Sequence, residues 1–403
     1  MTSPLPPAPA PPLTHYRPHR WLQKNLFNSW LNGLITIVLG GVLLWAGIGF
    51  LRWAIGAADW RVIPANLPLY FVGRYPADQY WRLWLMLAII GALSGLSWGV
   101  LAQRAIRLFT VPVLAGLSLG AIGIILIPTP PLYRLFALAI ALISAISAWG
   151  GRQGARQFPP LSRWLSLLWA VTFVMSFWLI RGGLGLKVVS TNDWGGLLLT
   201  LIMSLASILL CFPLGVLLAL GRQSPLPVVR GLSIAYIELV RGVPLISILF
   251  MGQVMIPLFL PEGVRPDRVV RAILGLTLFS AAYLAENVRG GLQAVPRGQL
   301  EAANALGLNA PLTVGLIVLP QAIKISIPAI VGQFIGLFQD TTLLSIVGLL
   351  ELLGISRAIL ANPEFLGKYG ETYLFIGVIY WGFCYAMSIG SRRLEKHLNT
   401  GQR

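Results

Sequence analysis

The sequence predicts an all-α fold, a polytopic membrane helical bundle of about ten transmembrane helices. Hydrophobic residues make up 56% of the 403 residues, and the mean hydropathy is +0.77. Charged residues make up only 11%, well below the quarter or so found in soluble domains. Apolar runs of about 20 residues, the length that a helix needs to cross a bilayer, recur along the chain. These observations place the chain among multi-span membrane proteins.

Ten apolar segments are long enough to be considered as spans. They cover residues 29–51, 83–102, 108–127, 133–150, 164–181, 194–220, 243–260, 269–290, 322–350 and 372–391. A turn containing Pro128, Pro130 and Pro131 separates the third segment from the fourth. Prolines also interrupt the seventh and ninth segments.

Composition divides the chain into four parts. Residues 1–28 begin with a proline-rich stretch and are expected to be a disordered cytoplasmic tail. Residues 29–190 hold the first five segments, residues 191–392 hold the second five, and residues 393–403 form a basic cytoplasmic tail. The two membrane regions differ in charge, because almost all of the 13 acidic residues follow residue 190.

Glycines recur at four-residue spacing in the first half of the chain. They form the series Gly91, Gly95 and Gly99 and the pair Gly116 and Gly120. Such spacing lets transmembrane helices approach each other closely. No motif in this half indicates chemistry, so it is expected to serve packing or assembly.

The charge and the metal-binding residue types exclude several classes of function. The net charge of +17 comes from basic residues scattered between apolar runs, which indicates loops that meet lipid headgroups rather than a nucleic-acid surface. Cys211 and Cys384 fall inside apolar segments and are expected to be small buried hydrophobes. The histidines, His15, His19 and His397, lie near the termini, so no histidine-based site is expected inside the membrane.

No phosphate-binding loop of the form G-x-x-x-x-G-K-[ST] occurs. The pair Gly367-Lys368 is followed by Tyr369 and lacks the upstream glycine. If ATP drives the protein, ATP and Mg²⁺ must bind a separate subunit, and no cofactor is expected on this chain. A membrane-embedded enzyme would need convergent catalytic groups, which the sequence does not offer, so the chain is not expected to be an enzyme.

The stretch 297–320 is a polar interruption with basic flanks between two long apolar segments. Its first half is rich in strong helix formers, so a short helix is expected there. Gly307 is placed to end that helix in a left-handed conformation. Glu301 carries a charge, and Ala302 and Ala303 leave a flat surface that another protein can approach closely.

This stretch resembles the EAA loop of ABC importer permeases. The family pattern is Glu-Ala-Ala, three residues, Gly, nine residues, Ile, one residue and Leu-Pro. Every position is matched, by Glu301, Ala302, Ala303, Gly307, Ile317, Leu319 and Pro320. In that family the loop is a cytoplasmic coupling helix that lies in a groove of the ATPase. The resemblance implies that these residues couple the ATPase to the spans, and that the five C-terminal helices form the permease core.

The same loop sets the expected orientation. With the loop in the cytoplasm and ten spans, both termini are cytoplasmic. The basic residues show a modest excess on the same side, as the positive-inside rule requires. The expected location is the bacterial inner (plasma) membrane.

Two pairs of opposite charges lie three residues apart and therefore share a helix face. Glu238 and Arg241 are expected to form an interfacial pair. Glu286 and Arg289, at the inner end of the eighth segment, either brace the start of the stretch 297–320 or line the transport path. The segments around both pairs resemble polar-amino-acid permeases.

A third match to those permeases covers residues 338–348. Asp340, Thr341 and Thr342 lie there in an otherwise apolar segment. Such residues usually face the protein interior or a wet cavity, so they are either satisfied by neighbouring helices or line the path. Relatives often carry Lys where Gln339 stands, so no charge pair is carried over to Asp340.

With its long N-terminal half, the chain most resembles the larger permease subunit of general L-amino-acid importers. The resemblance implies import of polar or acidic L-amino acids, a second permease chain in a heterodimer, an ABC ATPase dimer and an extracytoplasmic substrate-binding protein. An ion-coupled secondary amino-acid transporter is the alternative. Such transporters often show internal repeats and intramembrane ionisable residues. The two halves show no repeat, and Asp340 is the only plausible deep acid, so the importer is favoured.

Overall fold

The computed structural model describes residues 18–102, 108–126, 129–158, 160–261 and 263–399. Every regular element in these ranges is a helix, which confirms the all-α prediction. The chain separates into two compact units, residues 1–59 and 60–403, and each is described by itself below.

The first unit is a helical segment with no core of its own. It comprises α1 (Pro18–Asn25), α2 (Trp30–Arg52) and the π-helical turn η1 (Trp53–Ala57). Ser29 caps α2, because its hydroxyl accepts a hydrogen bond from the Asn32 amide at 3.2 Å. No residue of α2 is buried. The predicted disordered tail is therefore wrong at Pro18–Asn25, which is helical, while residues 1–17 lie outside the described ranges.

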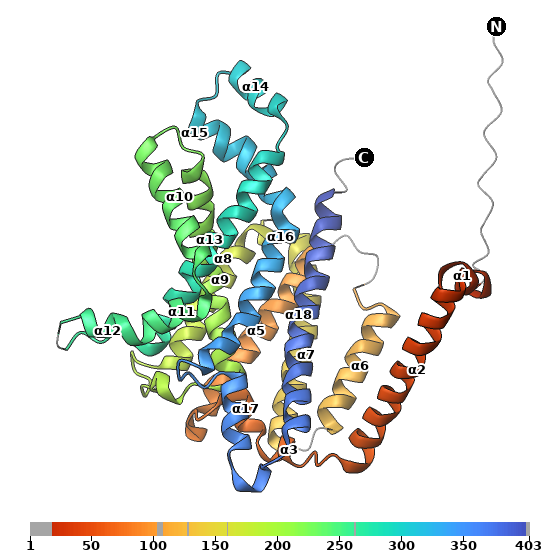
Figure 1. Cartoon of the computed structure of the whole chain (residues 1–403). Helices are drawn as coiled ribbons and strands as arrows, with labels where there is room; N and C mark the ends of the chain where they lie inside the picture. Colours follow the sequence, from red (N-terminus) through yellow and green to blue (C-terminus); the bar gives the residue numbers. More distant parts are fainter. Residues whose placement is uncertain (1–17, 103–107, 127–128, 159, 262, 400–403) are drawn as a thin grey trace. The chain divides into compact units, whose positions relative to one another are not determined.

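The second unit begins with a helical bundle formed before residue 190. Its elements are α3 (Val62–Ala65), α4 (Leu67–Val72), η2 (Ala77–Gln79), α5 (Tyr80–Leu101), α6 (Val111–Leu126), α7 (Pro131–Gln157) and α8 (Leu161–Arg181). Figure 1 shows these helices in orange to yellow.

The same unit continues to the end of the chain. Its remaining elements are η3 (Thr191–Asp193), α9 (Gly196–Arg222), α10 (Pro227–Gly242), α11 (Leu245–Phe250), η4 (Met251–Met255), α12 (Ile256–Phe259), α13 (Arg268–Ala294), α14 (Arg297–Ala305), α15 (Ala310–Leu312), η5 (Thr313–Val318), α16 (Leu319–Asp340), η6 (Thr341–Ser345), α17 (Leu352–Leu360), η7 (Pro363–Phe365) and α18 (Tyr369–Asn399). Because α18 continues to Asn399, most of the tail predicted at residues 393–403 is helical.

Eight helices in the described ranges are long and apolar enough to cross a membrane. They are Trp30–Ala57, Ala77–Leu101, Pro131–Gln157, Leu161–Arg181, Gly196–Arg222, Arg268–Ala294, Ala310–Ser345 and Tyr369–Lys396. A ninth is reached if α10 and the α11–α12 segment, which meet at a bend of 102°, count as one broken span. The polytopic helical prediction is thus confirmed, whereas the count of about ten is not.

Two predicted segments account for the difference in helix count. The predicted segment 108–127 contains α6 (Val111–Leu126), whose apolar part, Val113–Ile125, is shorter than a full span. Residues 243–260 do not form a straight helix. Pro244 fixes an extended backbone between α10 and α11, and the π-helical turn η4 then interrupts the segment. Proline lacks the N–H that a continuous helix would need at this point.

Close backbone contact joins α5 to α7, as the glycine spacing predicts. A Cβ atom added at Gly95 would overlap the carbonyl oxygen of Ser144, and one at Gly99 would overlap that of Ala148. The facing Gly151 of α7 would in turn overlap the carbonyl of Leu96. The Gly116 and Gly120 pair behaves differently, because nothing lies within 4 Å of either added Cβ atom.

The two sides of residue 190 share hydrophobic cores. One cluster brings Tyr75, Leu83 and Ile180 together with Trp194 and Leu198. The Tyr75 hydroxyl also donates to the carbonyl of Ile180 at 2.9 Å. The compositional division near residue 190 is therefore not a boundary between compact units.

A buried acid organises the end of the molecule opposite α14. Glu351 is fully buried and caps α17, accepting hydrogen bonds from the amides of Leu353 at 2.7 Å and Gly354 at 2.8 Å. The Tyr380 hydroxyl of α18 donates to the same carboxyl at 3.1 Å. Burial raises the pKa of Glu351 to about 7, although the hydrogen bonds favour the charged form.

The α5–α7 contact predicts a sharp difference between two glycine-to-alanine changes. Gly95→Ala should lower the stability of the protein by about 1–3 kcal/mol, because its methyl group meets backbone that cannot turn aside. Gly150→Ala, in α7 with nothing within 4 Å of the added Cβ atom, is the matched control. Melting temperatures in detergent, followed by tryptophan fluorescence, should fall only for Gly95→Ala. Equal melting temperatures for the two variants would contradict the contact.

Candidate functional site

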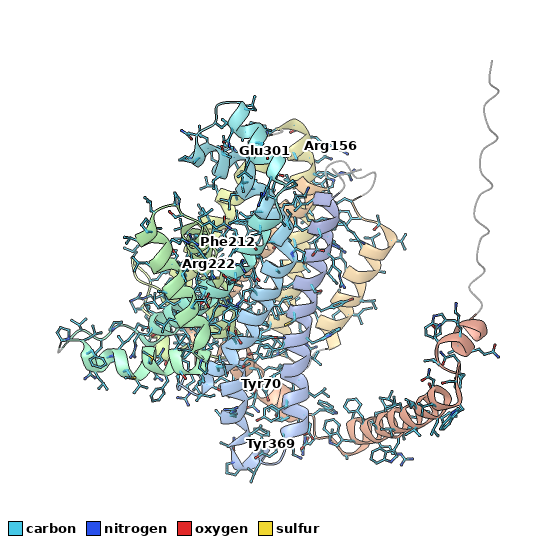
Figure 2. The ribbon with its side chains drawn as sticks, turned by 45° about the horizontal axis from the view of Figure 1, so that its top comes forward. Tyr70, Arg156, Phe212, Arg222, Glu301 and Tyr369 are labelled. Carbon is cyan, nitrogen blue, oxygen red and sulfur yellow. The ribbon has the colours of Figure 1, made fainter. Side chains whose placement is uncertain are left out.

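The Glu-Ala-Ala sequence lies on the short helix α14, which extends beyond the bundle at one end (Figure 1). Figure 2 places Glu301 and Arg156 toward this end and Tyr70 and Tyr369 toward the other. Glu301 and Ala302 are exposed, while Ala303 is buried. The outer face of α14 therefore offers one carboxylate and a small side chain to a partner.

The end of α14 has the geometry of a glycine-terminated helix. Gly307 has a φ of 74°, in the left-handed region that favours glycine. The Leu308 amide donates to the carbonyl of Ala303 at 3.1 Å, and the Gly307 amide donates to that of Asn304 at 3.0 Å. This pair of bonds is the Schellman motif. The short helix and its glycine stop, both predicted from sequence, are confirmed.

The second half of the stretch 297–320 belongs to the next span rather than to a loop. Asn309 caps α15, accepting from the Leu312 amide at 3.1 Å, and the chain is helical from there to Ser345. Ile317, Leu319 and Pro320 therefore lie on the rising helix. The π-helical turn η5 precedes Pro320, with the Leu319 amide donating to the carbonyl five residues back.

A side-chain contact ties α14 to this span. The Gln321 amide nitrogen lies 3.3 Å from the Gln299 side-chain oxygen of α14 and 2.9 Å from the carbonyl of Ile317. The Gln321 side chain, in the first turn of α16, is thus hydrogen-bonded both to α14 and to the turn that precedes α16. Movement of α14 has a direct mechanical connection to the 36-residue span.

A charge network lies where α9, α10 and α13 meet, close to the C-terminal end of α13 that leads into α14. Its centre is Glu286, whose side chain is only 15% exposed. Its carboxylate oxygens lie 2.9 Å from Arg289, 3.1 Å from Arg222 and 3.7 Å from Arg241. Arg222 also contacts Glu238 at 2.8 Å. One acidic group therefore links three helices.

The network confirms one predicted pair and corrects the other. Glu286 and Arg289 pair as expected. Glu238 and Arg241 share a face of α10, but each finds a partner on another helix, so the predicted direct pair is wrong. Sequence reasoning did not single out Arg222 for this role. The available signal was its position as the last residue of a span, at the depth where the other four charges lie.

The polar residues at the end of α16 mostly satisfy themselves. The hydroxyl of Thr341 donates to the carbonyl of Phe338 at 2.7 Å, and that of Thr342 donates to Gln339 at 2.8 Å. These bonds support the 3₁₀ turn η6. Asp340 is half-buried, and its carboxylate has no hydrogen bond or ion pair among the interactions of the described residues. Of these three residues, both threonines have a hydrogen-bonded side chain, whereas the Asp340 carboxylate is without a partner among the described residues.

Comparison with known proteins gives the family. The sequence model of the family described as binding-protein-dependent transport system inner membrane component matches residues 211–400. The inner membrane amino-acid ABC transporter permease protein YhdY of Escherichia coli is 40% identical over 402 residues, covering 95% of this chain and 93% of that one. The chain belongs to this family. It is an amino-acid ABC importer permease subunit, a non-catalytic membrane component.

Two further relatives show how the permease is built. The glutamate/glutamine/aspartate/asparagine transport system permease protein BztC of Rhodobacter capsulatus is 38% identical over 439 residues, covering 100% of this chain and 98% of that one. The probable glutamine ABC transporter permease protein GlnP of Bacillus subtilis is 34% identical over 202 residues, covering 50% of this chain and 91% of that one. Shorter permeases of about half this length therefore share part of the chain, and the family implies ATPase and substrate-binding partners in general.

The charge network generates a prediction about stability. Glu286→Gln should cost about 1.5–3 kcal/mol, because it removes the negative charge that three neighbouring guanidinium groups share. Glu238→Gln is the matched control, since the Glu238 side chain is 55% exposed and has one arginine partner; it should cost less than about 1 kcal/mol. Thermal unfolding of the purified permease in detergent measures both. A larger loss of stability in Glu238→Gln than in Glu286→Gln would show that Glu286 is not the centre of the network.

Proposed function

We propose that the chain is the membrane pathway subunit of an ATP-driven importer that carries polar and acidic L-amino acids into the cytoplasm. The observation that carries the proposal is the family membership together with α14, an exposed helix with the full Glu-Ala-Ala pattern and its glycine stop. The full-length similarity to BztC, whose name specifies glutamate, glutamine, aspartate and asparagine, supports the substrate class.

In this proposal α14 is the surface on which an ATPase subunit docks. ATP and Mg²⁺ bind the ATPase dimer, and the permease itself carries no cofactor. Closure of the ATPases displaces α14, and the Gln299–Gln321 contact and the Glu286 network transmit that displacement to the spans behind it. A helix surface with Glu301 and Ala302 exposed and Ala303 buried suits close docking against a groove.

The proposed orientation has α14 and both termini in the cytoplasm of a bacterial inner membrane. Its support within the second unit is that the C-terminal end of α18 lies toward the same end of the bundle as α14 (Figure 1). Lys24, just before the span that starts at Trp30, favours a cytoplasmic N-terminus. A second permease chain, expected as a heterodimer, and an extracytoplasmic binding protein complete the importer.

Asp340 is the residue of this chain that we assign to the transport path. Its carboxylate is half-buried in a span and lacks a partner among the described residues. Polar groups at such depth usually face a water-filled cavity or substrate pathway. The hydroxyls of Thr341 and Thr342 are assigned a structural role, because both bond to backbone carbonyls within their own turn.

If an ATPase docks on α14, a change on its exposed face should abolish transport while the amount of permease in the membrane stays normal. Glu301→Lys reverses the charge on the docking face and should lower uptake of labelled L-glutamate at least about tenfold, the equivalent of 1.4 kcal/mol in subunit association. The matched control is Glu364→Lys, an exposed acid beyond α17 at the opposite end. Both variants should be present in the membrane at normal abundance by immunoblot. Normal uptake by Glu301→Lys would argue strongly against coupling through α14.

The substrate class predicts the outcome of an uptake panel. Cells lacking the chain should regain uptake of glutamate, aspartate, glutamine and asparagine when the gene is restored, with less effect on leucine and lysine. Uptake should continue when proton and sodium gradients are collapsed at constant ATP. Loss of uptake under that condition would instead indicate an ion-coupled transporter. Restoration of leucine or lysine uptake alone would contradict the acidic and polar substrate class.

A further inference from the structure

A polar cavity lies beside the Glu286 network, where α9, α10 and α13 meet. Its volume is about 470 Å³, and its wall is formed by Arg222, Gln223, Arg230, Ile234, Arg289 and Gln293. Three guanidinium groups and two amides therefore line it, with one apolar side chain. No carboxylate lies in the wall. A ligand that fits this cavity must be rich in hydrogen-bond acceptors and negatively charged.

The charges around the cavity are only partly neutralised. Arg222 and Arg289 contact Glu286, which is not among the lining residues, and these ion pairs hold their guanidinium groups in place. Arg230 is exposed and makes no ion pair among the described residues. Counting Arg241, four arginines and two acids, Glu286 and Glu238, lie in or beside the cavity wall. Two positive charges remain without a counter-ion.

The depth of the cavity indicates which anion can reach it. Arg222 is the last residue of one span, and Arg289 and Gln293 lie in the last two turns of another. The opposite face of α10 exposes Val228 and Leu232, 70% and 69% accessible, from its first turn onward. A helix with an exposed apolar face and basic residues on its other side lies in the membrane interface, with the apolar face toward lipid. The cavity therefore lies at the level of the headgroups, not in bulk water.

We propose that this cavity binds the phosphate headgroup of an anionic phospholipid. Arginine forks match the oxygens of a phosphate group, and basic pockets between transmembrane helices suit such headgroups. If α14 is cytoplasmic, as proposed above, the bound lipid belongs to the cytoplasmic leaflet. The preference for an anionic headgroup does not depend on that orientation. A bound lipid phosphate supplies one negative charge against the excess of two, and it holds together the helix ends that lead into α14.

The test uses the purified full chain, with any subunits that copurify, in a mild detergent. Dioleoyl phosphatidylglycerol and dioleoyl phosphatidylcholine are titrated separately, and thermal unfolding is followed by tryptophan fluorescence. Phosphatidylglycerol should raise the melting temperature at lower mole fractions than phosphatidylcholine. Arg230→Gln should need about fivefold more phosphatidylglycerol for the half-maximal shift, the effect expected for one basic residue at an anionic headgroup. Gln293→Glu, which adds a negative charge to the wall, should weaken the effect further.

Arg392→Gln is the matched control, because Arg392 is an exposed cation near the end of α18, outside the cavity. It should leave the phosphatidylglycerol titration unchanged. Equal stabilisation by the two lipids, or an equal loss in Arg392→Gln, would overturn the proposal. Stabilisation by inorganic phosphate or L-glutamate at the same concentrations would overturn it too, by revealing a site for soluble anions. The lipid titration measures stability in detergent and involves no transport. A negative result would therefore overturn the lipid site without contradicting the proposed transport function, which the uptake experiments test separately.

Discussion

The carboxylate of Glu286 holds together the C-terminal ends of α9, α10 and α13. It is almost buried and is surrounded by Arg222, Arg241 and Arg289, each from a different position on these helices. Charges at such depth require partners, so the helices can separate only if guanidinium groups lose their acceptor. This requirement keeps the three ends in register directly before the chain enters α14. The three helix ends are therefore held as one body where the chain enters α14.

The parts of the fold that sequence could predict are those set by local chemistry. Gly307 ends α14 because its φ of 74° suits glycine alone, and the neighbouring residues are strong helix formers. Glu286 and Arg289 pair because they are one helical turn apart. The spacing of Gly95 and Gly99 predicts a close helix neighbour, although not which helix it is. Each of these features depends on residues within one or two turns of each other.

The features that sequence could not predict depend on residues distant along the chain. Glu238 pairs with Arg222 of α9 rather than Arg241 of its own helix, because the packing of α9 against α10 brings that partner closer. Glu351 is fully buried, although an acid directly after a predicted span suggests exposure. Its carboxylate accepts hydrogen bonds from the start of α17 and from Tyr380. Pro244 predicts a break after α10 but not the size of the bend, which is 102° where both α10 and α11 pack against α13.

The span Ala310–Ser345 is longer than a bilayer requires. Its 36 residues extend about 54 Å at the usual rise per residue, against a hydrocarbon core of about 30 Å. A rod of this length behaves as a lever: a tilt of about 10° displaces its far end by about 9 Å. The π-helical turn η5, near the Gln299 contact, is the point where the rod is least regular and bends most easily. Under the proposed coupling, a small displacement at α14 would therefore arrive at the Asp340 end of the span as a larger sideways displacement.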